Sequence, residues 1–493
     1  MGLREKTTSG IKWNAVATIT TILISILQLS ILTRLLEKSD FGLIAIASLI
    51  ISFTGLFSEM GITVALIHKQ NISQDEYSSM YWLNVSTNLA MCLITILTAP
   101  LVATFYNEPS LVKIITVLAM TYVFNAFGKI FYTIKIKELE FNFISKIRII
   151  TALEGFVVTI LLAYLGYGVM SLAYGQVFAI GSNQLVFAIA GYKSQTVRFH
   201  FSLTEIIPFL KIGGYQFLTQ ILDFLASRLD VFLIGKFFTM DELGVYNIAK
   251  ELVLKPYNLL NNITSNVFSS AFAKIQNDLQ ALRDNFKKLI QTIAIATLPL
   301  YAILFIFSDL IVLILYGSAF YEVATFIRIL TCVGVFSAIS SQGGVVMISL
   351  GRTDLGLRWT IARIIMSTIV IVTLSLVGLY AVAYGQTLLE IVSLYVYYCI
   401  VIRPMLKLSF TNYLVMFRNI TLSIIVITIC FAFININYAI PLWGQMMMLA
   451  TFLLLIYIYI YKCHPFIFCI MKGFIPKCPG GYFSHFRNVT NKF

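Results

Sequence analysis

Two long apolar segments of this chain each carry a single row of polar side chains. In segments 13–35 and 213–236 the polar residues recur in steps of four, three, four and three, which places them on one face of a helix. The first row is Asn14, Thr18, Thr21, Ser25 and Gln28, and the second is Gln216, Gln220, Asp223, Ser227 and Asp230. Such rows either join helices inside a membrane bundle or line a path for a polar ligand.

Ionisable side chains favour the second interpretation. Ten of them lie inside apolar segments: Glu59, Lys129, Glu154, Asp223, Arg228, Asp230, Lys250, Glu251, Lys255 and Glu390. Facing lipid at the bilayer centre, each would cost about 2.5–3.5 kcal/mol. They must therefore face a hydrated cavity or pair with one another, as Glu251 and Lys255 could at a spacing of four residues.

The residue types indicate three kinds of binding. A phosphate could be clamped by the cations Arg228, Lys250, Lys255 and Lys129, with Arg148 and Arg363 at the mouth of the cavity. The polar remainder of a substrate could be bound by the amides Gln28, Gln216, Gln220, Asn258 and Asn262. A coupling H⁺ or Na⁺ could be carried by the carboxylates Asp223, Asp230, Glu59, Glu154 and Glu390. For any one of these residues, an ion pair that only stabilises the bundle is an equally good interpretation.

Enzyme and metal signatures are missing from the sequence. It contains no phosphate-binding Gly-rich loop, no HExxH and no GxSxG. The tail residues Cys463, Cys469, Cys478 and His485 do not have the spacing of a zinc site. We therefore expect no catalytic residues, no metal and no cofactor, and a protein that is not an enzyme.

Composition identifies the elements that must position these side chains. Of the 493 residues 59% are hydrophobic and 12% are charged, against about 45–50% and 25% in soluble domains. Apolar runs of spanning length fall at about 13–35, 41–67, 79–105, 110–132, 147–166, 169–191, 213–236, 243–270, 287–316, 324–348, 358–377, 380–402, 418–437 and 440–461. The sequence thus predicts an all-α integral membrane protein with about fourteen transmembrane helices.

The distribution of basic residues predicts the topology. With fourteen spans, 26 of the 35 Lys and Arg residues fall on the side of the termini and 5 on the other side. Basic residues accumulate in cytoplasmic loops, so both termini are expected in the cytoplasm. The same rule accounts for the net charge of +13 without nucleic acid as a partner.

An internal repeat divides the chain. The segment Asp40-Phe41-Gly42-Leu43 aligns with Glu242-Leu243-Gly244-Val245 at an offset of 202 residues, and Ala-Tyr-Gly-Gln occurs at both 173–176 and 383–386. We therefore predict two parallel six-helix lobes, residues 1–200 and 201–410, followed by two appended helices and a basic cytoplasmic tail in 411–493. A central cavity is expected between the lobes, walled by spans 1, 2, 7 and 8.

Several short motifs carry a family resemblance. They are Leu3-Arg4-Glu5-Lys6-Thr7, Thr33-Arg34-Leu35-Leu36, Met80-Tyr81-Trp82-Leu83-Asn84-Val85, Lys137-Glu138-Leu139-Glu140-Phe141 and Ala271-Phe272-Ala273-Lys274-Ile275-Gln276. Together they resemble the colanic-acid-exporter type of polysaccharide flippase. That group belongs to the multidrug/oligosaccharidyl-lipid/polysaccharide exporter superfamily. The resemblance covers nearly the whole chain and is clearest over residues 1–410.

The resemblance implies a bacterial inner-membrane protein that works by alternating access. Its substrate would be an undecaprenyl-diphosphate-linked oligosaccharide, a precursor of O-antigen, capsule or exopolysaccharide, flipped from the cytoplasmic to the periplasmic leaflet. Implied partners are membrane lipid, H⁺ or Na⁺ as coupling ion, and the polysaccharide polymerase with its chain-length machinery. Relatives are described with cationic cavities, from which the mixed charges of this chain depart.

Two other functions stay open. A cation-coupled multidrug antiporter of the same superfamily is favoured by the carboxylates in spans 2, 7 and 12. A membrane polysaccharide polymerase or acyltransferase would need an external reaction site, and polymerases usually have one long external loop. The short predicted external segments, near 34–40, 106–110 and 237–243, argue against such an enzyme.

Overall fold

The computed structural model describes residues 3–59, 63, 66–67, 69, 72–194, 196–437, 444–445 and 447–452. These residues form helices and short connections with no β-strand, which confirms the prediction of an all-α fold. Ten helical segments among them are long and apolar enough to cross a membrane, so the protein is a multi-pass membrane protein. The last predicted span, 440–461, falls largely outside these ranges, and the total of fourteen stays a prediction.

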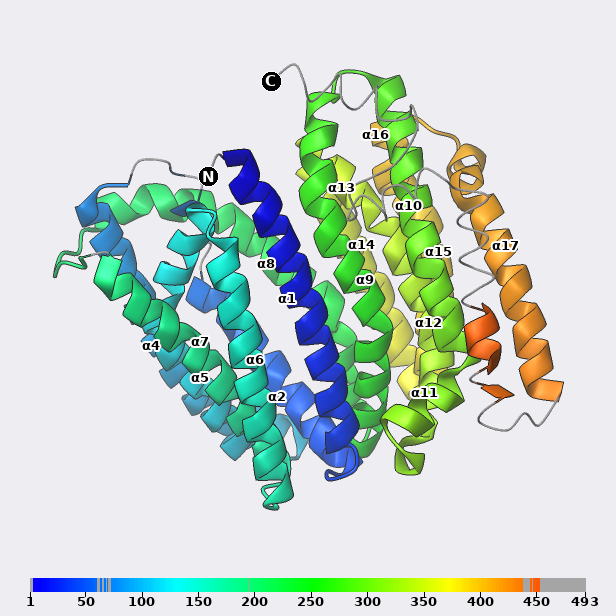
Figure 1. Ribbon diagram of the computed structural model, residues 1–493, viewed down its shortest axis with the longest axis horizontal. Helices are drawn as coiled ribbons and strands as arrows, with labels where there is room; N and C mark the ends of the chain where they lie inside the picture. The colour runs from blue at the N-terminus through cyan, green and yellow to red at the C-terminus, as the bar shows by residue number, and fades with distance from the viewer. Residues whose placement is uncertain are drawn as a thin grey trace.

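One group of helices forms the left half of the molecule in Figure 1. We call it the N-terminal lobe; it consists of α1 (Leu3–Leu32), α2 (Lys38–Glu59), α4 (Gln74–Tyr106), α5 (Ser110–Lys137), α6 (Phe141–Tyr164) and α7 (Val169–Ser194). Helix α5 packs between α4 and α7, and α6 packs against α7 and α1. Helix α1 lies at the inner side of this group, toward the centre of the molecule (Figure 1).

The second group forms the right half of Figure 1. We call it the C-terminal lobe; it consists of α9 (Met240–Lys274), α10 (Leu279–Ile306), α11 (Ser308–Leu315), η1 (Ser318–Phe320), α12 (Glu322–Ser340), α13 (Gln342–Ser349), α14 (Thr353–Ser375), α15 (Leu379–Tyr397), η2 (Tyr398–Ile402) and α16 (Arg403–Leu406). Helix α12 packs against α9, α10 and α15. Helix α17 (Phe410–Asn437) covers the outer face of α10.

Helix α8 (Leu203–Phe237) joins the two lobes. It packs on α2 and α4 of the N-terminal lobe and on α14 of the C-terminal lobe. Phe217 packs edge-to-face on Phe57 of α2, and the ring of Phe224 packs against Phe53 at a tilt, with ring centroids 5.2 and 5.7 Å apart. The predicted division at residue 200 thus falls just before a helix that contacts both halves, and the domain limits at 200 and 410 stay predictions.

The two ends of the molecule differ. We call the end at which α1 begins the terminal face and the opposite end, where α1 ends, the distal face. The lobes are tightly joined at the distal face, where α2 crosses α9. A Cβ atom on Gly42 would lie 2.1 Å from the carbonyl oxygen of Met240, and one on Gly244 would lie 2.1 Å from that of Lys38. Only glycine permits so close a crossing, which therefore depends on both residues.

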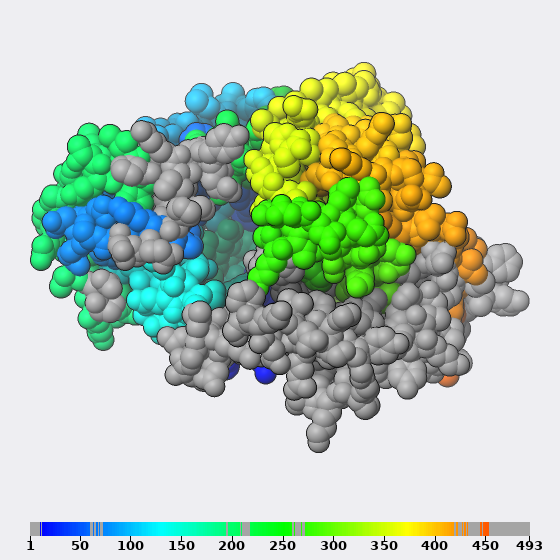
Figure 2. Space-filling view, turned by 90° about the horizontal axis from the view of Figure 1, so that it is seen from above, coloured from blue at the N-terminus to red at the C-terminus, as the bar shows by residue number. Residues whose placement is uncertain are grey.

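Polar contacts reinforce the distal seal. The Lys38 ammonium lies 3.1 Å from the Glu322 carboxylate on α12, and Arg34 donates a hydrogen bond of 3.2 Å to the carbonyl oxygen of Ile314. Seen from the terminal face, by contrast, the molecule is hollowed between the lobes (Figure 2). The structure is therefore closed at the distal face and open at the terminal face.

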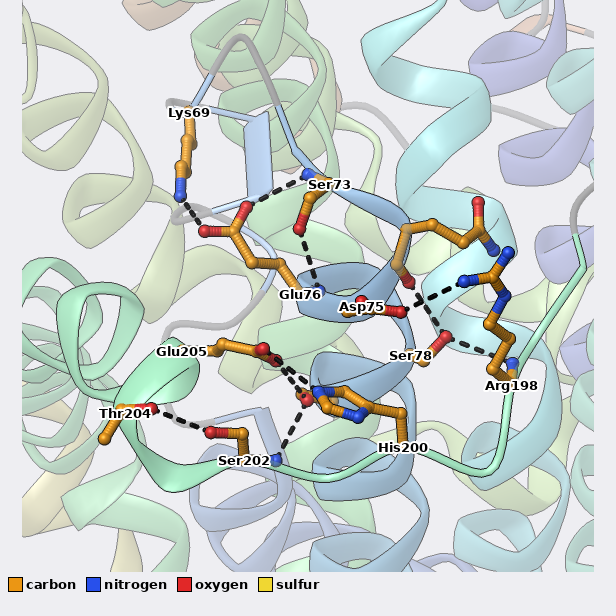
Figure 3. A network of polar contacts seen from close by, with 12 residues as sticks. Lys69, Ser73, Asp75, Glu76, Ser78, Arg198, His200, Ser202, Thr204 and Glu205 are labelled. Atoms are coloured by element: carbon orange, nitrogen blue, oxygen red, sulfur yellow. Dashed lines mark hydrogen bonds and ion pairs between the residues drawn. The ribbon is translucent and has the colours of Figure 1, made fainter.

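The connection between α7 and α8 is bound to the start of α4 (Figure 3). The backbone N–H groups of Arg198 and Ser202 donate to the hydroxyls of Ser78 and Ser79, each at 3.1 Å. The Ser79 hydroxyl in turn donates to Glu205 at 2.6 Å. We call this set of contacts the linker clasp, because it fastens the chain between the lobes to the N-terminal lobe.

Candidate functional site

Two cations reach the polar row of α1 from different lobes. Lys255 on α9 donates a hydrogen bond of 2.7 Å to the Ser25 hydroxyl, and the Arg148 guanidinium on α6 lies 3.5 Å from the Thr21 hydroxyl. Thr21 and Ser25 are one helical turn apart, on the same face. Among the residues that the structure describes, neither cation has a carboxylate within 4 Å. In the described part of the chain these two cations form no ion pair, and both face hydroxyls of α1.

The other three cations of the predicted clamp each hold a carboxylate. The pairs are Arg228 with Glu251 at 3.3 Å, Lys250 with Asp230 at 2.7 Å, and Lys129 with Glu59 at 2.7 Å. Lys129 and Glu59 also lie apart from the others, in a small pocket of the N-terminal lobe beside the buried amides of Asn84 and Asn88. The structure thus separates the predicted cations into one without an acidic partner and three that are neutralised.

A cavity of about 870 Å³ opens on the C-terminal side of the molecule. The described residues that line it come from α8, α9, α12, α13, α14, α15 and η2. The sequence placed the cavity between the lobes, with spans 1, 2, 7 and 8 as its walls. The structure places this cavity beside spans 7 and 8 and, among the described residues, adds helices of the C-terminal lobe to its walls.

Arg363 and Glu390 form the third ion pair of this cavity. The guanidinium on α14 lies 2.5 Å from the carboxylate on α15, which is only 6% exposed and also accepts from Ser393 at 3.2 Å. Arg363 was expected at the mouth of the cavity, and it is among the residues that line it. Desolvation makes an unpaired charge in such a place costly, which explains why each cation here has an acidic partner.

The predicted amides are distributed over both lobes. Asn258 lines the cavity, Gln220 is half-buried on α8, and Gln28 is half-buried on α1. The side chains of Gln216 and Asn262 lie outside the described part of the chain. The structure therefore brings Asn258, but not Gln28, to the same cavity as the ion pairs.

The predicted ion-coupling carboxylates differ in their partners. Asp223 accepts a hydrogen bond of 3.3 Å from Thr360 and has no cation within 4 Å among the described residues. Asp230 is held by Lys250 and by the Tyr246 hydroxyl at 2.8 Å. Glu154 is half-buried on α6, away from the cavity lining. Asp223 is thus the cavity carboxylate most able to exchange a small cation.

Sequence reasoning missed the aromatic wall of the cavity. Trp359 lines it, and its ring packs edge-to-face on Tyr397 with centroids 4.9 Å apart. A signal was present in the sequence, because Trp359, Arg363 and Ser367 recur every four residues and so share a face of α14. In the described residues no cluster of three His, Cys, Asp or Glu side chains could hold a metal ion.

Comparisons with known proteins agree with this architecture. The chain is 29% identical over 415 residues to the lipopolysaccharide biosynthesis protein WzxC of Escherichia coli (strain K12), covering 84% of each chain. It is 25% identical to the teichuronic acid biosynthesis protein TuaB of Bacillus subtilis (strain 168), covering 71% of this chain and 73% of that one.

Solved structures share the fold. The lipid II flippase MurJ in an inward closed conformation superposes with a TM-score of 0.70 at 15% identity, covering 94% of this chain and 100% of that chain. An inward-facing multidrug resistance MATE family transporter of the MOP superfamily gives a TM-score of 0.62 at 14% identity, covering 78% and 96%. At these identities the likeness concerns the fold alone.

The family follows from the sequence match. Residues 31–325, more than half of the chain, match the family described as polysaccharide biosynthesis protein. The motifs of the sequence had indicated a protein of polysaccharide export, and the match confirms membership of a polysaccharide biosynthesis family. The chain is a member of the polysaccharide biosynthesis protein family.

Proposed function

We propose that this protein flips a lipid-linked oligosaccharide across the bacterial inner membrane during surface polysaccharide synthesis. Family membership supports the proposal, as do relatives named for the biosynthesis of lipopolysaccharide, amylovoran and succinoglycan, the last as a transport protein. The carrier lipid would be undecaprenyl diphosphate, and the protein would be a transporter and not an enzyme. A polymerase and chain-length machinery would consume the flipped unit.

One observation carries the proposal: the positive charge of Arg148 and Lys255 on the hydroxyl row of α1. A diphosphate is doubly anionic and accepts several hydrogen bonds, so it suits two cations and the hydroxyls of Thr21 and Ser25. Because the cations come from different lobes, a diphosphate held by both would link the two halves. It would thereby favour the arrangement in which they approach.

The asymmetry of the two faces gives the direction of movement. With both termini in the cytoplasm, the hollow between the lobes would open to the cytoplasmic side and the α2–α9 crossing would seal the periplasmic side. Substrate would enter from the cytoplasmic leaflet and leave after the seal opens, as in alternating access. We infer that Asp223 exchanges the coupling H⁺ or Na⁺, since Thr360 is its hydrogen-bond partner and it forms no ion pair with any cation in the described ranges.

Deletion of the gene tests this function. We expect surface polysaccharide to disappear and lipid-linked repeat units to accumulate on the cytoplasmic side. The wild-type gene should restore export, whereas a Lys255→Gln, Arg148→Gln double variant expressed at the same level should not. Normal surface polysaccharide in the deletion strain would overturn the proposal.

A multidrug antiporter is the second candidate, because the cavity contains carboxylates that could bind a cationic drug. It predicts that the deletion strain becomes sensitive to cationic dyes while its polysaccharide stays normal. The names of the sequence relatives favour the flippase, since all four that name a pathway refer to a polysaccharide or an envelope polymer.

A further inference from the structure

The 870 Å³ cavity is built differently from the site on α1. It lies between α8 and the helices α9 and α12–α15, and its described lining contains no residue before Leu218. Its volume falls within the range of about 300–1,000 Å³ that is usual for small-molecule sites. It is therefore large enough for a sugar unit, and separate from the hydroxyl row that holds Lys255 and Arg148.

The charges of this cavity favour an uncharged ligand. Each of its three cations, Arg228, Lys250 and Arg363, is paired with a carboxylate within 3.3 Å. Asp223 adds a further carboxylate, so the cations do not outnumber the acids. To bind Lys250 or Arg363, a diphosphate would have to displace the buried carboxylate of Asp230 or Glu390, which is costly. A polar ligand without charge can instead form hydrogen bonds to the outer atoms of these pairs.

The aromatic wall suits the apolar face of a sugar ring. Trp359 is held by its edge-to-face contact with Tyr397, which is 4% exposed, so its orientation is fixed before a ligand arrives. Rigid aromatic rings supply a large contact area at little cost in conformational entropy. A sugar presents C–H groups on one face of its ring and hydroxyls at its edge, which matches an aromatic wall with polar groups around it.

Polar groups able to bind sugar hydroxyls lie around this wall. Gln386 and Ser367 form a hydrogen bond of 3.2 Å, and Ser341 and Asn258 also line the cavity. Amides and hydroxyls both donate and accept, so they can satisfy a neighbouring hydroxyl whichever way it points. Gly344 lines the same cavity, and a Cβ atom built on it meets no atom within 4 Å.

We propose that this cavity is a sugar-binding subsite that takes an uncharged sugar of the repeat unit, with Trp359 as the stacking surface. The proposal rests on the proposed flippase function and divides the substrate between two places. The diphosphate binds on α1 between Arg148 and Lys255, and the sugar enters the cavity of the C-terminal lobe. Trp359 and the residues around Gly344 therefore act on specificity for the sugar.

Binding measurements with two lipids test whether the diphosphate and the sugar bind at these two separate places. The purified full-length protein is titrated with sugar-free undecaprenyl diphosphate and with the lipid-linked oligosaccharide extracted from the producing cells. We expect wild type to prefer the sugar-bearing lipid by about tenfold, equivalent to about 1.4 kcal/mol. Trp359→Ala should abolish this preference and leave the affinity for the sugar-free lipid unchanged, whereas Trp359→Tyr should retain most of it.

A second variant on another helix guards against misfolding at Trp359. Gly344→Leu and Gly344→Phe start from a Cβ atom that has free space and fill the cavity with side chains of increasing size, so the preference should fall stepwise. Thermal stability, measured on each variant, should stay close to that of wild type. The matched control is Ile369→Phe, on an exposed part of α14 outside the cavity lining. It should behave as wild type.

The outcomes separate the two proposals. If wild type shows no preference, or if the variants at Trp359 and Gly344 retain it, the sugar subsite is wrong. In that case the flippase proposal stands as long as sugar-free undecaprenyl diphosphate binds and Lys255→Gln weakens that binding. If neither lipid binds to the wild-type protein, the proposed function itself fails.

Discussion

The Lys255 ammonium on α9 donates a hydrogen bond of 2.7 Å to the Ser25 hydroxyl on α1, so a cation of one lobe touches a helix of the other. Lys255 and Ser25 lie 230 residues apart in the chain. A hydroxyl satisfies only part of what an ammonium ion can bind, and this cation keeps donors for an anionic ligand. The contact therefore joins substrate binding to the relative position of the lobes.

Removing this charge should weaken transport. Lys255→Gln is expected to lower polysaccharide export and the affinity for undecaprenyl diphosphate by about tenfold or more, because a hydrogen bond to a charged group contributes about 1.5–3 kcal/mol. The matched control is Lys287→Gln on the exposed part of α10, which removes the same charge away from the site. Equal export in both variants would contradict the assignment.

The glycine crossing at the distal face should not tolerate larger residues. Gly42→Leu or Gly244→Leu forces α2 and α9 apart, at an expected cost of about 1–3 kcal/mol to the closed arrangement. We expect reduced export, and greater reactivity of a cysteine placed near Gly42 toward an impermeant thiol reagent added from outside. Gly55→Ala, also on α2, where a Cβ atom would lie 3.7 Å from its nearest neighbour, should leave both measurements unchanged. Full activity of Gly42→Leu would show that the crossing does not act as a seal.

A cross-link between Lys38 and Glu322 should arrest the transport cycle. Their charged atoms lie 3.1 Å apart across the lobes, so cysteines at both positions can be joined by a short bifunctional reagent. The seven native cysteines are replaced first. Export should stop after cross-linking with a reducible reagent and resume after reduction, whereas either single cysteine should be unaffected. Continued export by the cross-linked protein would mean that the distal face does not open.

The linker clasp should weaken in acid. Hydrogen bonds from Ser79 and His200 lower the pKa of Glu205, which lies outside the predicted span 213–236. The clasp therefore gains stability above the ordinary pKa of glutamate, about 4.3, and loses it as pH falls through the lowered value. Hydrogen exchange of the Arg198 and Ser202 amides, corrected for intrinsic rates, should show this loss. Glu205→Gln should be less protected already at neutral pH; equal protection would refute the role of the carboxylate.

The sequence predicted the fold better than it predicted the contacts of the candidate site. Apolar runs were sufficient to predict the all-α membrane fold, because spanning length and hydropathy are local properties. The repeat around Gly42 and Gly244 predicts that the two lobes are related. The long reach of α8 over both lobes was not predicted, because it depends on packing that hydropathy does not encode.

At the candidate site, the sequence could not predict which charged side chains form ion pairs with one another. The spacing of Glu251 and Lys255 suggested a local pair, yet Glu251 binds Arg228 and Lys255 binds Ser25. Likewise Arg363 and Glu390 come from separate helices, and no spacing rule links them. Residue types thus identified which charged side chains lie within the membrane helices, while their partners depended on the tertiary arrangement.

The reciprocal contact at the distal face also bears on how this chain arose. Lys38 and Gly42 occupy the same places in the first repeat as Met240 and Gly244 in the second, and each glycine meets the other repeat's backbone. Such mutual contact is what a two-fold axis produces in an isologous dimer. An ancestral six-helix protein could have formed this crossing with a second copy of itself, and fusion of two genes would then have allowed the halves to specialise.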